Sequence, residues 1–316
     1  MRERIAVAID RQALDGNLAD DITRAVATIH PEMAWELAPG RSAKHAFCIS
    51  PEGRADLRQI ALRWLASAPA QDGTWEFHAS RQPAENLPQL EVAGARFDLA
   101  EMRAITSWDS SRFRVDVRLW HPSFERVPPP VRAQVGFLFL DNLLGEDDVE
   151  RWIGAIEYLD DPISGKTPAE LKAEVDRHRV PSSDDDGRWV LGTLNTPAGV
   201  SIVAADAGLK RIDHPFADKH VEIAIVLDHG GMPGDEEATR LNAWEDDLVE
   251  LFDSVAVFAG RTTRPGLRTM HFVAEDLDRV RRVIDAWAES LPPVRVKVGF
   301  GEDMNWAFRQ QEFGLQ

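Results

Sequence analysis

The chain contains a single cysteine, Cys48, in 316 residues. One cysteine cannot form an intrachain disulfide and cannot build a cysteine-rich zinc site. This composition is typical of reducing compartments, so we expect a cytoplasmic location. Because Cys48 is predicted to share a sheet face with the small side chains of Ala6, Ala8 and Ala46, we interpret it as a buried packing thiol and not as a nucleophile.

Long apolar runs are also absent. The longest, Val135 to Leu140, is far shorter than the roughly 18 residues that a membrane-spanning helix needs. We therefore expect no membrane partner. An apolar share of 44% still indicates a folded globular protein, and 316 residues are enough for two domains with sizeable cores.

Positively charged residues are scarce. The chain has 36 lysines and arginines but 53 aspartates and glutamates, which gives a net charge of −17. Such a chain repels the phosphates of nucleic acids and anionic lipids, and no basic stripe counters this repulsion. We expect no nucleic acid partner. The acidity either keeps the protein in solution or attracts a basic protein partner.

Familiar catalytic motifs are missing as well. The sequence has no HExxH, no G-x-S-x-G, no P-loop and no GxGxxG motif. The histidines are scattered singly, and the closest pair, His214 and His220, is separated by a predicted turn at Pro215 and Phe216. We therefore expect no catalytic residues, no metal site and no cofactor.

One order of elements, β-α-β-β-α-β, is predicted near each end of the chain. In the C-terminal copy, valines and a phenylalanine alternate with polar residues along 294–300, which predicts a strand with one buried face. Apolar residues recur every three or four positions in the two predicted helices. The expected elements are the strand 220–227, the helix 236–252, the strands 254–259 and 267–274, the helix 276–291 and the strand 294–300.

The N-terminal copy shows the same order, with matching stripes of apolar residues in its two predicted helices. Its expected elements are the strand 4–9, the helix 17–29, the strands 33–37 and 44–49, the helix 54–68 and the strand 74–78. This order is that of the ferredoxin-like fold. We therefore predict an α+β protein that contains two ferredoxin-like units with antiparallel sheets. Such a scaffold carries no particular chemistry, because function resides in sites grafted onto a fold.

An accessory ββαβ segment is predicted between the copies, at residues 90–160. Its elements are a hairpin of residues 102–108 and 112–120, an apolar helix at 131–144 that begins after three prolines, and a strand at 149–159. Asp141 lies inside the apolar helix. A buried carboxylate needs a partner, which is Arg151 or a backbone donor, or else it serves as a functional acid.

A linker is predicted at 160–188, where proline, serine, aspartate and lysine predominate. It contains a helix near 168–178 and the acidic run Asp184 to Asp186. A hairpin of residues 189–194 and 200–204 follows. We therefore expect two domains: residues 1–180, with the first ferredoxin-like unit, the accessory segment and the linker helix, and residues 181–316, with the hairpin and the second unit.

A candidate binding face lies on the C-terminal sheet. In the predicted strand order the last strand neighbours the first, so Arg295 and Lys297 are expected beside Glu222, and Glu222 beside His271. Opposite charges on neighbouring strands stabilise each other by roughly 0.2–1 kcal/mol. The face is either an ion-paired, solvated or interdomain surface, or a binding surface with a titratable histidine.

His229 is a further candidate binding residue. It lies in the loop Asp228-His229-Gly230-Gly231 between a strand and a helix, where backbone amides could hold an anion. Acidic residues at the start of this helix, Asp235 to Glu237, already satisfy its positive dipole end. The alternative to anion binding is a turn before a well-capped helix.

Five segments of the C-terminal part together resemble the bacterial family called domain of unknown function 695. They are GRWVLGTLNTPAGVSIVAADAGL, HVEIAIVL, DHGGMPGDEEATRLNAWEDDL, AVFAGRTTRPGLRTMHFVA and EDMNWAFRQ. The stretch HPEMAWELAPGRSAKHAFCISPEG is similar to segments of other uncharacterised bacterial proteins. The family has no assigned activity. Some of its architectures are similar to, or joined with, the regulator B of ribonuclease E, an acidic protein that inhibits an enzyme by binding it.

Two functions follow from these observations. The preferred hypothesis is a non-catalytic protein-binding or regulatory module, because catalytic motifs are absent, the chain is acidic and the resemblance offers an analogy to a bacterial regulator. The alternative is a small-molecule sensor or enzyme that uses a groove between the domains, near His229, His271 and Arg295. The sequence leaves the oligomeric state open.

Overall fold

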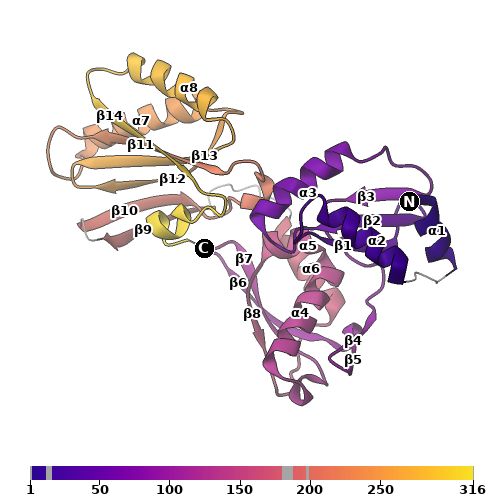
Figure 1. Cartoon of the computed structure of the whole chain (residues 1–316). Coiled ribbons are helices and arrows are strands. Elements are labelled where there is room, and N and C mark those ends of the chain that lie inside the picture. Colours follow the sequence, from indigo (N-terminus) through magenta and orange to yellow (C-terminus); the bar gives the residue numbers. More distant parts are fainter. Residues whose placement is uncertain (1, 12–15, 180–187, 197–198, 316) are drawn as a thin grey trace. The chain divides into compact units, whose positions relative to one another are not determined.

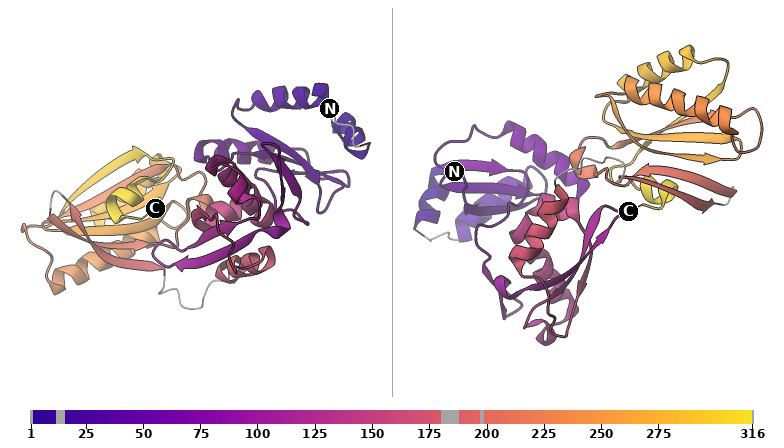
Figure 2. Two further views of the ribbon diagram at one scale, coloured as in Figure 1. Left: turned by 90° about the horizontal axis from the view of Figure 1, so that it is seen from below. Right: turned by 180° about the vertical axis from the view of Figure 1, so that it is seen from behind.

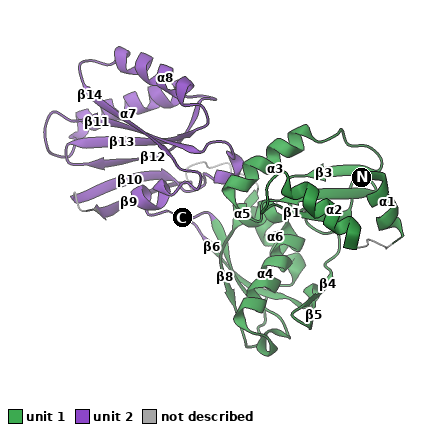
Figure 3. Cartoon of the chain, viewed as in Figure 1, with its two compact units in different colours: residues 1–108, 114–180 green, residues 109–113, 181–316 purple. Residues whose placement is uncertain are grey.

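A computed structural model describes residues 2–11, 16–179, 188–196 and 199–315 (Figure 1). The chain is an α+β protein that divides into two compact units (Figure 3). Unit 1 contains residues 1–108 and 114–180, and unit 2 contains residues 109–113 and 181–316. Within the described ranges, no helix combines the length and the apolar character needed to cross a membrane.

The first part of unit 1 is a small sheet flanked by helices. Strands β1 and β2 are antiparallel, whereas β2 and β3 are parallel. A parallel pair needs a crossover connection, which α3 provides. In chain order the elements are α1 (Arg2–Asp10), α2 (Gly16–Ala27), β1 (Ala34–Pro39), β2 (His45–Ser50), α3 (Ala55–Ser67) and β3 (Trp75–His78).

The predicted ferredoxin-like unit at residues 1–80 is wrong. Residues 4–9, expected as its first strand, belong to helix α1. Ile5 and Ile9 are four residues apart, which suits a helix, and a short apolar run does not distinguish a helix from a strand. Because this strand is missing and β2–β3 is parallel, the two ends of the chain are not copies of one fold. The other helices and strands predicted for this part are confirmed.

The second part of unit 1 contains the accessory segment. Its hairpin and its apolar helix are confirmed, but the expected strand at 149–159 begins only at Ile153, because a short helix precedes it. Strand β7 lies between β6 and β8. The elements are β4 (Gln89–Val92), β5 (Ala95–Asp98), η1 (Leu99–Glu101), β6 (Arg103–Asp109), β7 (Arg114–Trp120), η2 (Phe124–Arg126), α4 (Pro129–Leu144), α5 (Glu146–Trp152), β8 (Ile153–Tyr158) and α6 (Pro168–Arg179).

One hairpin of this part was not predicted, one predicted helix is confirmed, and one predicted segment lies outside the described residues. The short hairpin of β4 and β5 was not predicted from the sequence. The predicted linker helix is observed as α6, whereas the acidic run 184–186 lies outside the described residues.

Helix α4 packs its apolar side into the core of unit 1. Val135, Phe139 and Leu140 are at most 1% exposed and lie in one cluster with residues of β7 such as Leu119. Phe137, on the same helix, is 51% exposed. The helix therefore fills the core and also presents one large aromatic side chain at the surface.

Unit 2 is built on a six-stranded antiparallel sheet with the strand order β14-β11-β13-β12-β10-β9. The predicted β-α-β-β-α-β order is observed from β11 to β14, and the predicted hairpin extends the sheet beside β12. The elements are β9 (Trp189–Thr196), β10 (Gly199–Asp206), η4 (Arg211–Asp213), β11 (Lys219–Val226), α7 (Asp235–Leu251), β12 (Ala256–Arg264), β13 (Leu267–Ala274), α8 (Leu277–Ser290), β14 (Arg295–Glu302) and η5 (Arg309–Phe313).

The two faces of this sheet have different covers (Figures 1 and 2). Helices α7 and α8 pack on one face, where Trp287 is 1% exposed. The C-terminal segment 303–315 packs on the other face, where Trp306 and Phe308 contact a cluster with Val203 and Val273. The C-terminal segment therefore covers part of the second face.

We expect Cys48 to react slowly with a thiol reagent in the folded chain. The residue is 5% exposed, and its pKa is raised far above the usual value, first by burial and then by the carboxylates of Glu146 and Glu36. The predicted neighbours Ala6 and Ala8 lie on α1 and do not share its sheet, so the register partners Glu36 and His78 take their place.

Labelling with 5,5′-dithiobis(2-nitrobenzoate) should be at least about tenfold slower in buffer than in urea, because only an accessible thiolate reacts. Equal rates in the two conditions would show that Cys48 is accessible in the folded protein.

Candidate functional site

Two histidines of unit 2 meet on the sheet face that carries the C-terminal segment. Nε2 of His220, on β11, lies 3.1 Å from Nδ1 of His271, on β13, and the rings are within 7° of parallel. Strand register causes this meeting, because His271 is paired with Glu222, and His220 lies two positions before Glu222 on the same face. The sheet thus joins side chains that are 51 residues apart in the sequence.

Aromatic rings from the C-terminal segment hold both imidazoles in place. The ring of Phe308 lies 4.0 Å from that of His220 and nearly parallel to it, and the ring of Phe313 meets His271 edge-on at 5.2 Å. Nε2 of His271 also lies 3.5 Å from Oγ1 of Thr262, on β12. As a result, His220 is 9% exposed and His271 only 1% exposed.

Both imidazoles are neutral at pH 7. Burial lowers the pKa of His220 to about 4. Burial, with a smaller contribution from His220, lowers the pKa of His271 to about 3. Since a neutral imidazole has one N–H and one free lone pair, one ring donates to the other across the 3.1 Å contact.

A polar cavity of about 120 Å³ lies beside the histidine pair. It contains two carboxylates, Glu222 and Glu312. Burial raises the pKa of Glu312, and the Glu222 carboxylate raises it further. The lining residues are Leu194, Ser201, Glu222, Thr262, Arg264, Thr269, His271 and Glu312.

The predicted binding residues are brought together only in part. Glu222 lies opposite His271, as the predicted strand order implies. Arg295 and Lys297 are on the neighbouring strand, but Gly299 is the residue opposite Glu222, so the basic side chains are displaced along the strand.

His229 lies apart from this group. It is about half-exposed in its loop and makes a 2.7 Å contact with Glu237 of α7. Sequence reasoning missed His220 and Glu312. The position of His220, two residues before Glu222 in a strand, was the available signal for the first. No sequence pattern pointed to the second.

Unit 1 contains a larger cavity, of about 680 Å³. Its lining includes four carboxylates and two arginines, so the wall is acidic, and several apolar side chains of α4 and β8 complete it. The lining residues are Glu52, Gly53, Arg81, Arg114, Gln134, Phe137, Leu138, Asp141, Glu146, Val149, Glu150, Ile153, Gly154 and Ile156.

Asp141 lies in the wall of this cavity. Its partner is Arg81, whose Nη1 donates to Oδ2 at 2.8 Å, and not Arg151 or a backbone donor. Arg81 is shared, because its Nε also donates to Glu36 at 2.6 Å. Burial outweighs the attraction of this shared guanidinium and, helped by the Glu146 carboxylate, raises the pKa of Asp141 to about 6.

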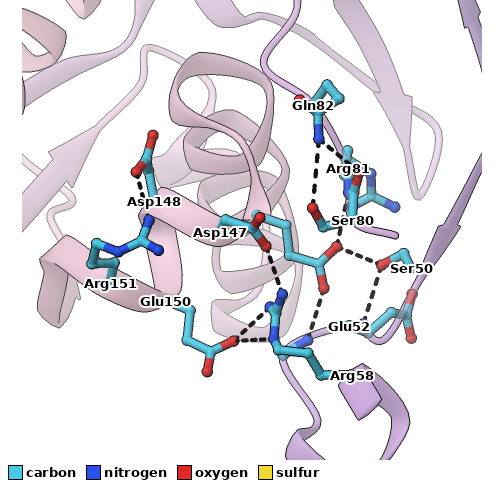
Figure 4. Close-up of polar contacts among 12 residues, drawn as sticks. Ser50, Glu52, Arg58, Ser80, Arg81, Gln82, Asp147, Asp148, Glu150 and Arg151 are labelled. Carbon is cyan, nitrogen blue, oxygen red and sulfur yellow. Dashed lines mark hydrogen bonds and ion pairs between the residues drawn. The ribbon is translucent and has the colours of Figure 1, made fainter. Parts of the chain in front are cut away.

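Several lining residues, among them Glu146, Arg81 and Glu150, belong to a buried polar network, and Figure 4 shows its contacts. The Glu146 carboxylate, at the start of α5, accepts hydrogen bonds from Ser50 Oγ and from the backbone N–H groups of Gly53 and Arg81, at 2.8 to 3.0 Å. The network joins two segments of the first part of unit 1 to α5: the end of β2 with the turn after it, and the loop after β3.

Arg58 adds charge pairs to the same network. It is 3% exposed, and its guanidinium contacts Asp147 and Glu150 at 2.6 Å (Figure 4). These contacts join α3 to α5. They satisfy most of the buried charges, which is typical of a structural role.

Comparison with known proteins identifies only the C-terminal part. Residues 200–311 match a family described as a family of unknown function, DUF695. This match confirms the resemblance expected from the C-terminal segments. No curated protein and no solved structure matches the chain. The histidine pair lies inside the matched range, and the larger cavity lies outside it.

Proposed function

We propose that the protein is a non-catalytic binding module whose large cavity in unit 1 takes a basic, partly apolar segment of a partner protein. The observation that carries this proposal is the lining of the cavity, in which carboxylates outnumber arginines two to one around apolar side chains. The net charge of −17 acts in the same direction, because it attracts basic partners over a distance.

The arginines in the wall are occupied by the protein itself. Arg81 is bonded to Glu36 and Asp141. Nη1 of Arg114 donates to the backbone oxygens of Glu150 and Ile153, at 2.6 and 2.9 Å. Asp141, Glu146 and Glu150 are also bonded inside the protein. Glu52 is therefore the lining carboxylate that a cationic ligand group would meet first.

Apolar contacts would supply most of the affinity. Phe137 lines the cavity and is 51% exposed, and Leu138 and Ile156 lie in the same lining. Aromatic side chains are enriched at protein interfaces, and a few anchors that become buried in a pocket carry most of the binding energy. Carboxylates around such an anchor select for lysine or arginine in the partner.

The chemistry of the lining favours binding over catalysis. Among the described residues that line the cavity there is no serine, threonine, cysteine, histidine, lysine or tyrosine. Asp141 has a raised pKa, but the described lining places no hydroxyl, thiol or amine nucleophile beside it, and the nearby Glu146 carboxylate is held by three hydrogen bonds. The element order of unit 2 supports the expected ferredoxin-like scaffold, and the single cysteine suits a cytoplasmic protein.

A peptide pair tests the proposal. We expect an acetylated and amidated hexapeptide of alternating arginine and leucine to bind the full chain, and its glutamate–leucine counterpart not to bind, in isothermal titration calorimetry. The Phe137→Ala variant should bind the basic peptide about tenfold more weakly. Added salt should weaken binding, because exposed charges are screened.

Leu251→Ala is the matched control, because Leu251 is 52% exposed in unit 2 and lies outside the cavity. Its affinity for the basic peptide should equal that of the unchanged protein. Equal binding of both peptides, or an unchanged affinity in Phe137→Ala, would refute the proposal. Binding of free arginine amide as tightly as the peptide would favour a small-molecule sensor instead.

A further inference from the structure

We infer that His220, Glu222 and His271 bind a divalent transition-metal ion in unit 2. The sequence predicted no metal, because no two histidines have the spacing of a metal motif. Strand pairing brings His220 and His271 into contact although they are 51 residues apart in the sequence, so their spacing does not exclude a metal site. The site is separate from the large cavity and independent of the proposed function.

The distances among the three side chains suit a single ion. One ligand atom from each residue lies within 4.8 Å of the other two. Two nitrogens bound to one tetrahedral zinc ion are about 3.3 Å apart, as bond lengths near 2.05 Å require. The separation of 3.1 Å between His220 Nε2 and His271 Nδ1 is close to this value, so the two nitrogens already have the spacing that a shared ion requires.

Carboxylates complete the set of ligands. The Glu222 side chain is 46% exposed, so it can swing toward the histidines, and one of its carboxylate oxygens already lies within 4.8 Å of a ring nitrogen of each histidine. Glu312 lines the same small cavity as Glu222 and His271. The charge of Glu312 adds to the attraction for a cation at the neighbouring Glu222, and a water molecule can take the fourth position.

The side chains around the two histidines fix the orientation of their rings, as the residues behind the ligands do in known metal sites. Nε2 of His271 faces Oγ1 of Thr262 at 3.5 Å, which leaves Nδ1 to bind the ion. Metal-binding histidines usually donate their second N–H to such a neighbour, which sets the tautomer. Phe308 and Phe313 pack on the two rings and limit their rotation.

The donor set selects the class of metal. Two imidazoles with one or two carboxylates suit zinc and its first-row neighbours, whereas magnesium and calcium prefer oxygen ligands alone. We therefore choose zinc as the probe for affinity and cobalt as the probe for coordination geometry.

The test uses the untagged full chain after removal of metal with EDTA. Equilibrium dialysis against micromolar zinc chloride, followed by elemental analysis, should recover about one zinc per chain. His271→Gln and Glu222→Gln should each bind zinc at least about tenfold more weakly. Cobalt should give the visible absorption bands of a tetrahedral site in the unchanged protein and lose them in both variants.

His229→Gln is the control, because His229 is exposed and lies in a separate loop. It should keep the zinc content and affinity of the unchanged protein. If His271→Gln fails to fold, as circular dichroism will show, the half-exposed Glu222→Gln variant decides. Zinc content at the level of a protein-free blank, or zinc bound equally by Glu222→Gln and the unchanged protein, would overturn the assignment.

Discussion

Replacing Glu146 with alanine is expected to lower the free energy of unfolding of unit 1 by roughly 3–5 kcal/mol, because the change leaves buried donors without an acceptor. The carboxylate is 5% exposed and accepts hydrogen bonds from Ser50 Oγ and from the N–H groups of Gly53 and Arg81. Ser50 and Gly53 belong to the end of β2 and the turn after it, and Arg81 belongs to the loop after β3. Loss of these hydrogen bonds should therefore release α5 from the first part of the unit.

Urea denaturation measures this loss, and hydrogen exchange resolved by peptide assigns it to unit 1. Glu157→Ala is the control, because Glu157 is an exposed carboxylate on the neighbouring strand β8. This variant should change the stability by less than about 0.5 kcal/mol. A Glu146→Ala protein as stable as Glu157→Ala would show that water replaces the lost acceptor and that the network is not structural.

Replacing Asp141 with asparagine is expected to stabilise the protein at pH 8 by up to about 3 kcal/mol. In the folded chain the pKa of Asp141 is raised to about 6, from 3.8 for an unperturbed aspartate. The folded state thus holds this proton more tightly than the unfolded state. The ionised carboxylate therefore penalises folding above pH 6, and the penalty fades as the pH falls toward 4. Asparagine carries no such charge.

Urea denaturation at several pH values between 4 and 8 tests this expectation. The advantage of Asp141→Asn should be largest at the alkaline end and shrink through pH 6. Asp161→Asn, which changes an exposed aspartate, should show no such trend. If Asp141→Asn is less stable than the unchanged protein at pH 8, the contact with Arg81 outweighs the cost of burial.

Sequence patterns predicted unit 2 best. The stripes of apolar residues in α7 and α8 and the alternation of apolar and polar residues in β14 are local signals. They predict which side of each helix or strand is buried. Once the strand order was expected, the pairing of Glu222 with His271 followed from the register. The same reasoning failed at α1, because a short apolar run such as residues 5–9 fits a strand and a helix equally well.

The sequence by itself determined the acidic charge, the α+β class and most helices and strands, since these depend on composition and on patterns a few residues long. Only the tertiary structure decided which distant side chains meet: His220 with His271, Arg81 with Asp141, and Glu146 with the loop at Ser50. Such contacts depend on strand register and on how the layers pack. Spacing along the chain does not encode either of them, so both candidate sites appear only in three dimensions.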